Sequence, residues 1–232
     1  MLPKSRKDVL SINNWRPISL LNVDYKIAAK CIANRVKKVI TSIISEEQTG
    51  FIKGRYIGEN VRLISEVIEN TNTTDEPGLI FFTDFNNKAL DSLDHSINFS
   101  DAIIRWMQLL YNNANASVTN NEYMSEFFNI NKGVRQGCPL SPYLFIVCIE
   151  ILSIMIETNK NIKGIKINNV DDDGSFPLQG TKRSFENLIT TLEQFGKLSG
   201  LKLSMSECTV LRIGSLRKHN VTFCPEKNIH WT

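Results

Sequence analysis

The longest apolar run of the sequence, residues 143–156, places the strongest constraint on the fold, because other parts of the chain must shield it from water. Ser141 can cap a helix and Pro142 suits a first helical position, so the sequence predicts a helix over residues 142–157. The run is too short to cross a bilayer and contains Glu150. We therefore expect a buried core helix and no membrane contact.

A glycine-flanked loop, "GVRQGC" at residues 133–138, leads into this helix. Gly133 and Gly137 permit backbone conformations and close approaches that a β-carbon forbids. The loop can therefore present Arg135 and Gln136 at the surface against a rigid helix. Such an arrangement is typical of a site that binds a ligand.

Apolar residues make up 42% of the 232 residues, enough for the core of one large or two modest domains. The 27 basic and 24 acidic residues give a net charge of only +3, which does not by itself identify a nucleic-acid-binding protein. Five widely spaced cysteines without a CxxC pair disfavour a disulfide framework and a zinc site. The first residues lack the apolar core of a signal peptide, so we expect an intracellular protein, with nucleus and cytoplasm left open.

An amphipathic helix is predicted over residues 24–44, starting at Asp24. Its predicted inward residues follow a helical period and are Ile27, Cys31, Val36, Val39, Ile40 and Ile43. Its other face could follow a phosphate backbone, although a basic run of this kind is more often the solvated side of a surface helix. The basic residues of that face are Lys26, Lys30, Arg35, Lys37 and Lys38.

Three further elements are predicted from hydrophobic periodicity and turn residues. A second amphipathic helix covers roughly residues 59–70, after a basic stretch that contains glycines at 46–60. A β-hairpin is expected over residues 116–130, and an amphipathic helix over residues 183–200 that ends at a glycine.

Two predicted strands end in carboxylates. The stretch "LIFFTDF" (79–85) is predicted to be a buried strand that ends near Asp84, and the alternating Ile165 and Ile167 lead toward Asp172 and Asp173. Buried carboxylates need a partner or a metal, and paired Mg²⁺ ions can clamp the oxygens of a phosphoryl transfer. The stretch "DDDG" is equally compatible with a plain tight turn.

A calcium-binding loop is the other metal-site hypothesis for this stretch. Asn169, Asp171, Asp173 and Gly174 match the first half of an EF-hand loop. Its last position falls on Gly180 instead of a glutamate, and strand-like alternation replaces the entering helix. The pattern therefore fails, and a phosphoryl-transfer site is the better interpretation.

Several long stretches occur in the order in which the reverse transcriptases of LINE-type, non-LTR retrotransposons carry their conserved blocks. The chain resembles that family over nearly its whole length. The matching stretches are "NWRPISLLN" (14–22), "QTGFIKGR" (48–55), "DFNNKALDSLDH" (84–95), "GVRQGCPLSPYLF" (133–145), "DDDGSF" (171–176) and "FGKLSGLKLS" (195–204).

The resemblance implies an α+β fold of the polymerase right-hand type, with a fingers-like subdomain at 1–78 and a palm at 79–232 that together form one reverse transcriptase domain. An antiparallel palm sheet would be backed by helices at 142–157 and 184–196, without a complete thumb. The implied activity is RNA-directed DNA polymerisation by two-metal nucleotidyl transfer. The implied cofactor is Mg²⁺, with Mn²⁺ as an alternative, and the implied partners are an RNA template, a DNA primer and deoxynucleoside triphosphates.

The resemblance also implies roles for individual residues. Asp84 matches the first metal-binding aspartate, and Asp172 and Asp173 match the paired aspartates of the catalytic turn. Lys53 and Arg55 fall on positions expected to contact triphosphate or template. The Arg135, Gln136 and Gly137 loop is expected to contact template and incoming nucleotide, and Leu90 stands where the family has an aromatic wall against the 2′-hydroxyl.

This copy departs from the family pattern in ways that predict lost activity. "DFNNKALD" carries one extra asparagine, Val170 and Asp171 replace an aromatic residue and an alanine, and Met205 and Glu207 stand where lysines are expected. Neither an endonuclease domain nor a thumb is recognised. The alternative function is therefore a catalytically inactive retroelement remnant that at most binds nucleic acid, and the sequence leaves its oligomeric state open.

Overall fold

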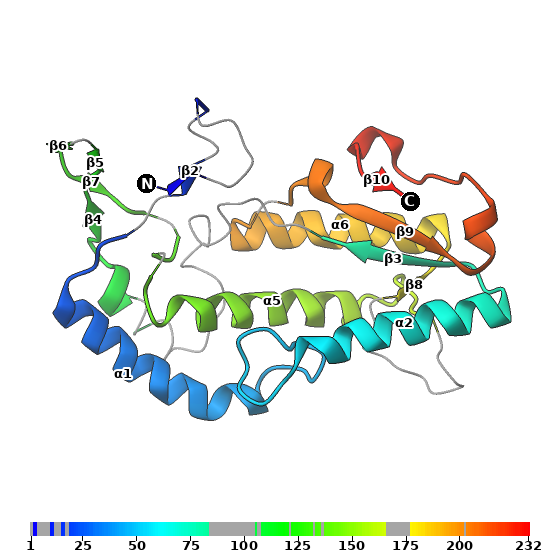
Figure 1. The fold of residues 1–232 in the computed structure, drawn as a ribbon, viewed down its shortest axis with the longest axis horizontal. Helices are drawn as coiled ribbons and strands as arrows, with labels where there is room; N and C mark the ends of the chain where they lie inside the picture. Colours follow the sequence, from blue (N-terminus) through cyan, green and yellow to red (C-terminus); the bar gives the residue numbers. More distant parts are fainter. Residues whose placement is uncertain are drawn as a thin grey trace.

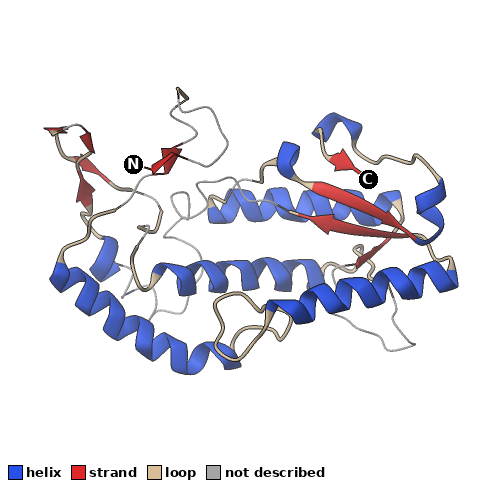
Figure 2. Ribbon diagram, viewed as in Figure 1, coloured by secondary structure: helices blue, strands red, loops and turns tan. Residues whose placement is uncertain are grey.

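The computed structural model of the chain describes residues 2–3, 10–11, 15–16, 19–83, 105, 108–120, 122–131, 133–135, 137–165, 177–201 and 203–232. Helices and short strands alternate along these residues, so the fold is α+β, as the sequence predicted (Figure 2).

A four-stranded sheet with the order β10-β9-β3-β8 forms the centre of the fold. Its strands are β3 (Gly78–Phe82), β8 (Pro177–Gln179), β9 (Thr209–Ile213) and β10 (His230–Trp231). The central strand β3 runs antiparallel to β8 and β9, whereas β10 is parallel to β9. The predicted strand at 79–85 is thus confirmed up to Phe82, and its last two residues lie outside the described part of the chain.

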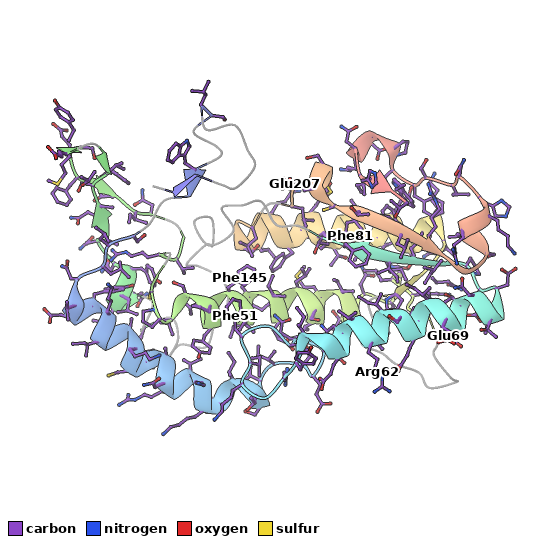
Figure 3. All side chains as sticks on the ribbon, viewed as in Figure 1. Phe51, Arg62, Glu69, Phe81, Phe145 and Glu207 are labelled. Atoms are coloured by element: carbon purple, nitrogen blue, oxygen red, sulfur yellow. The ribbon has the colours of Figure 1, made fainter. Side chains whose placement is uncertain are left out.

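Helices cover both faces of this sheet. Alternate residues of β3 point to opposite faces, so the strand contributes side chains to both layers of packing. On one face, the rings of Phe81 and Phe185 meet edge to face at 5.9 Å, which joins β3 to α6 (Lys182–Ser199) (Figure 3). On the other face, Ile80 packs with Ile213 and with Val67 of α2 (Ile57–Thr74). The sheet is therefore enclosed as the middle layer of the core.

The apolar run forms α5 (Ser141–Thr158), which runs beside α6 along the long axis of the molecule (Figure 1). By length and composition alone this helix could cross a membrane, yet Leu144, Cys148 and Leu152 are buried in the main hydrophobic core. The predicted core helix is confirmed. Ser141 does not act as its cap, because the Ser141 hydroxyl donates to the carbonyl of Arg135 at 2.9 Å.

The predicted inward face of the first helix is confirmed for Ile40 and Val36, which are buried or pack against the core, and is wrong for the other four residues. The helix α1 spans Val23–Val39 and continues as a short 3-10 turn, Ile40–Ser42. It buries Ala29 and Ala33, whereas Ile27, Cys31, Val39 and Ile43 are exposed. The reason is the contact with α5, since small alanine side chains let two helices approach closely.

A small hairpin projects from one end of the molecule (Figure 1). It confirms the prediction for residues 116–130 and consists of β4 (Asn115–Ala116), β5 (Thr119–Asn120), β6 (Tyr123–Met124) and β7 (Phe128–Asn129). The remaining elements are short. They are β1 (Leu2–Pro3), β2 (Trp15–Arg16) and the 3-10 turns Met205–Glu207, Gly214–Lys218 and Pro225–Lys227.

Candidate active site

The end of the central sheet toward which β3 runs is the candidate catalytic edge. Ile80 of β3 is paired with Pro177 of β8. On the far side of β8, the backbone N–H of Ile165 donates to the carbonyl of Pro177 at 2.9 Å, and that of Gln179 donates to the carbonyl of Lys163 at 2.8 Å. Residues 163–165 therefore run antiparallel to β8 and add a further strand-like segment at this edge.

This register determines where the neighbouring chain segments leave the sheet. Thr83, at the end of β3, and Gly164 line the same small cavity of about 80 Å³ under the sheet. The stretch that follows Thr83 and the stretch between residues 165 and 177 therefore depart from one end of the sheet. Those two stretches contain the predicted metal ligands.

Several predicted site residues lie outside the described part of the chain. They are Asp84, Leu90, Gln136, Asp172 and Asp173, together with Asn169, Asp171 and Gly174 of the EF-hand hypothesis. Among the described residues, no group of three His, Cys, Asp or Glu side chains is arranged to hold a metal ion.

A loop of residues 44–55, here called the clasp loop, connects α1 to α2 and contains both predicted cations, Lys53 and Arg55. The Arg55 guanidinium is turned inward and donates to three carbonyls of this loop: to Gln48 at 2.7 Å, to Ile44 at 3.2 Å and to Ser45. Lys53 is exposed beside Gly54, whose φ of +88° lies in the left-handed region. The two cations therefore differ: Arg55 shapes the loop, and Lys53 is directed to solvent.

The clasp loop is tied to α5 by a buried carboxylate. Glu150 is only 8% exposed, and its two oxygens accept hydrogen bonds from the backbone N–H and the hydroxyl of Ser45, each at 3.0 Å. Burying a carboxylate is costly unless it is hydrogen-bonded, and this pair of bonds meets that requirement. The signal in the sequence was the single charge inside an apolar run, although its partner could not be inferred.

We expect Arg55→Ala to lower the free energy of unfolding by about 1.5–3 kcal/mol, because three partly buried carbonyls lose a charged donor. Urea denaturation monitored by circular dichroism measures this change. Arg62→Ala is the matched control, since Arg62 is an arginine on the surface of α2 whose side chain is 82% exposed (Figure 3). Its denaturation midpoint should stay close to wild type, and equal losses in both variants would contradict the structural role of Arg55.

The glycine-flanked loop before α5 places Arg135 over an aromatic ring. Gly133 and Gly137 have φ values of +91° and +89°, as their predicted role requires. The Arg135 guanidinium lies 4.9 Å from the ring centre of Tyr25 on α1, a cation–π contact. The Nε atom of Arg135 is buried without a hydrogen-bond partner among the described residues. Tyr25 thus holds the guanidinium group of Arg135, a role that the sequence did not predict.

Two phenols meet the thiol of Cys138 behind this loop. The hydroxyl oxygens of Tyr25 and Tyr111 lie 3.7 and 3.9 Å from its Sγ atom. Burial, with Cys138 nearby, raises the pKa of Tyr111 to about 12, and burial also raises the pKa of Tyr25. Both phenols therefore keep their protons at neutral pH, and the cluster fixes the base of the Arg135 loop as a neutral hydrogen-bonded unit.

Comparisons with known proteins agree with this arrangement. The profile of the reverse transcriptase (RNA-dependent DNA polymerase) family matches residues 2–231. The chain is 30% identical over 250 residues to the transposon TX1 uncharacterized 149 kDa protein of Xenopus laevis, covering 100% of this chain and 18% of that protein.

Two more distant relatives are of the same kind. One is the retrovirus-related Pol polyprotein from type-2 retrotransposable element R2DM of Drosophila melanogaster, 24% identical over 223 residues, covering 90% of this chain and 20% of that protein. The other is the corresponding polyprotein from type-1 retrotransposable element R2 of Nasonia vitripennis, 25% identical over 211 residues, covering 86% of this chain and 20% of that protein. The chain spans about a fifth of the length of these relatives. It therefore belongs to the reverse transcriptase (RNA-dependent DNA polymerase) family, in the LINE-type group of non-LTR retrotransposons.

Proposed function

We propose that this chain catalyses RNA-directed DNA synthesis at the edge of the sheet where β3 ends. In this proposal α1 and the clasp loop belong to the fingers, and the sheet with α5 and α6 forms the palm. The observation that supports it is the register of β3, β8 and residues 163–165: the described residues that flank the two aspartate-containing stretches, Thr83, Ile165 and Pro177, lie at one end of the sheet. The substrates would be a primed RNA template and deoxynucleoside triphosphates.

In this proposal the three aspartates meet at this edge and hold a divalent metal pair. Asp84, Asp172 and Asp173 would supply carboxylate oxygens, which are the ligands that Mg²⁺ and Mn²⁺ prefer. When bound, such ions stabilise the attacking and leaving oxygens of a phosphoryl transfer. The three aspartates would hold them.

The described residues can position nucleic acid around this edge. Lys53 is exposed on the clasp loop, where an ammonium group can neutralise a phosphate. Phe51 is 73% exposed nearby, and its φ of 60° is strained for an aromatic residue, so it offers a ring for base stacking. Arg135, steadied by Tyr25, would contact template or nucleotide together with Gln136 and Gly137.

A second candidate function is a remnant that binds nucleic acid without copying it. The departures at Val170, Asp171, Met205 and Glu207, and the extra asparagine after Asp84, favour this candidate. Each changes a support of the same site, where a misplacement of about 1 Å can cost roughly a hundredfold in rate. The pairing of residues 163–165 with β8 favours the polymerase, because a strand-like segment precedes the stretch that contains Asp172 and Asp173 in the sequence.

The two candidates are separated by a primer-extension assay with a DNA primer annealed to RNA, tested with Mg²⁺ and with Mn²⁺. Metal-dependent extension supports the polymerase. Retained binding of the primed template without extension establishes the binding remnant. Absence of both contradicts both candidates.

We expect Lys53→Ala to weaken binding of single-stranded RNA and to reduce the slope of log K against log salt by about 0.7, the value of one phosphate contact. Fluorescence anisotropy over a salt series measures this slope. Lys218→Ala is the matched control, because that lysine is also exposed but lies beyond β9 and pairs with Asp75 at 3.5 Å. Equal slopes in wild type and Lys53→Ala would mean that Lys53 makes no phosphate contact and that the clasp loop is an ordinary solvated surface.

A further inference from the structure

A cavity of about 270 Å³ lies between the clasp loop, α2, α5 and the end of β3. We propose that it binds a small organic cation with a flat apolar body. Ile64, Val67, Ile80 and Phe82 contribute to its apolar wall. Its polar lining comes from the clasp loop, from Asn60 and from two residues of α5.

The charge of the lining determines the class of ligand. Glu47 and Glu150 both line the cavity, and none of the described residues that line it is Lys, Arg or His. A nucleotide or another phosphate would therefore meet two carboxylates and no cation among these residues, which is electrostatically unfavourable. A cationic head group would instead be attracted by the two carboxylates. The described lining therefore favours a cation over the phosphate-bearing substrates of the proposed polymerase, although the cavity adjoins the candidate catalytic edge.

Glu150 is the residue best placed to receive the cation. It is more than nine-tenths buried, and its oxygens already accept two hydrogen bonds from Ser45, which hold the carboxylate in one orientation. An ionised carboxylate offers about four acceptor positions, so it can accept further hydrogen bonds from an ammonium group. Because its orientation is fixed beforehand, little side-chain entropy is lost on binding.

The volume of the cavity limits the size of the ligand's apolar part. A buried apolar cavity of about 150 Å³ holds one benzene ring, so a cavity of about 270 Å³ suits two fused rings with a short arm. Phe82 at the end of β3, on the same face of the strand as Ile80, supplies aromatic surface for such rings. A ligand of this shape would connect the clasp loop to the sheet and to α5.

The test uses three naphthalene compounds of the same shape and different charge: 2-naphthylmethylammonium, 2-naphthalenemethanol and 2-naphthoate. Isothermal titration calorimetry on the full chain measures their affinities. We expect the cation to bind about tenfold or more tighter than the alcohol, because a hydrogen bond between charged groups is lost in the alcohol, and the carboxylate to bind weakest. Equal affinities, or no saturable binding of the cation, would overturn the proposal.

Variants locate the binding in the cavity. Ile64→Trp should fill it and remove binding of the cation, with Ile64→Phe as a smaller change that is easier to fold. The matched control is Val61→Trp, on the same helix but 61% exposed, which should leave the affinity unchanged. Glu150→Gln should reduce the preference for the cation over the alcohol. Circular dichroism confirms that each variant is folded, and a folded Ile64 variant that binds like wild type would place the ligand elsewhere.

Discussion

Asp84→Ala should reduce the rate of primer extension by about a hundredfold or more, with little change in the binding of primed template. The physical reason is that metal-assisted phosphoryl transfer depends on the position of the carboxylates, whereas binding depends on many cations spread over the surface. The measurement is single-turnover extension of a DNA primer on RNA, with template binding followed in parallel by anisotropy.

The matched control for this experiment is Asp24→Ala, an exposed aspartate in the first turn of α1. It removes the same charge from the chain without touching the catalytic edge, so its extension rate should equal that of wild type. A polymerase that kept its full rate after Asp84→Ala would show that the end of β3 does not carry the chemistry. The interpretation requires that the wild-type chain itself extends the primer.

Phe185→Ala is expected to lower the free energy of unfolding by about 3–5 kcal/mol, the range for truncating a large buried aromatic residue. Phe185 is fully buried and its ring contacts those of Phe81, Phe223 and Trp231 at centre-to-centre distances of 5.2–6.0 Å. Its removal leaves a cavity between α6 and the sheet, lined by the rings of Phe81, Phe223 and Trp231. Urea denaturation followed by circular dichroism gives the change.

Phe127→Ala tests whether the loss comes from burial rather than from the residue type. Phe127 belongs to the projecting hairpin and is 65% exposed, so its truncation removes little buried surface. The unfolding midpoint of this variant should stay near that of wild type. A Phe185→Ala variant that lost no more stability than Phe127→Ala would mean that the aromatic cluster is not part of the cooperative core.

The elements with one clear apolar face were predictable from the sequence. The helix α6 begins and ends within one residue of the range predicted from its periodicity, and Gly200, with a φ of 75°, follows its last residue. The strand β3 was recognised because five consecutive residues are glycine or strongly apolar and are followed by a carboxylate. In both cases local pattern and tertiary burial agree.

The inward face of α1 was not predictable, because the pattern compares hydrophobicity alone. Ile27 and Cys31 are the more apolar residues, but they point to solvent, and the contact with α5 is made where Ala29 and Ala33 are small. Close helix packing favours small side chains at the crossing point, and a hydrophobic period does not indicate where that point lies.

The polar contacts of the site could not be predicted from local sequence patterns either. Ser45 and Glu150 are 105 positions apart, and Tyr25 and Cys138 are 113 positions apart. Only the fold brings such pairs together, so a sequence can show that Glu150 needs a partner without showing which residue it is. The same limit explains why Arg55 and Lys53, two positions apart in one motif, were assigned one role and have two different environments.

The central position of β3 has a consequence for the order of folding. Both strands that hydrogen-bond to it come later in the chain, β8 at residues 177–179 and β9 at residues 209–213. On the ribosome, β3 therefore emerges long before either neighbour and has to wait with its apolar side chains exposed. Long-range pairing of this kind slows folding and prolongs the interval in which chains aggregate. A nascent chain arrested before residue 209 would leave one edge of β3 unpaired, so β9 is the segment that completes the pairing of the central strand, and only the short β10 is then added at the edge.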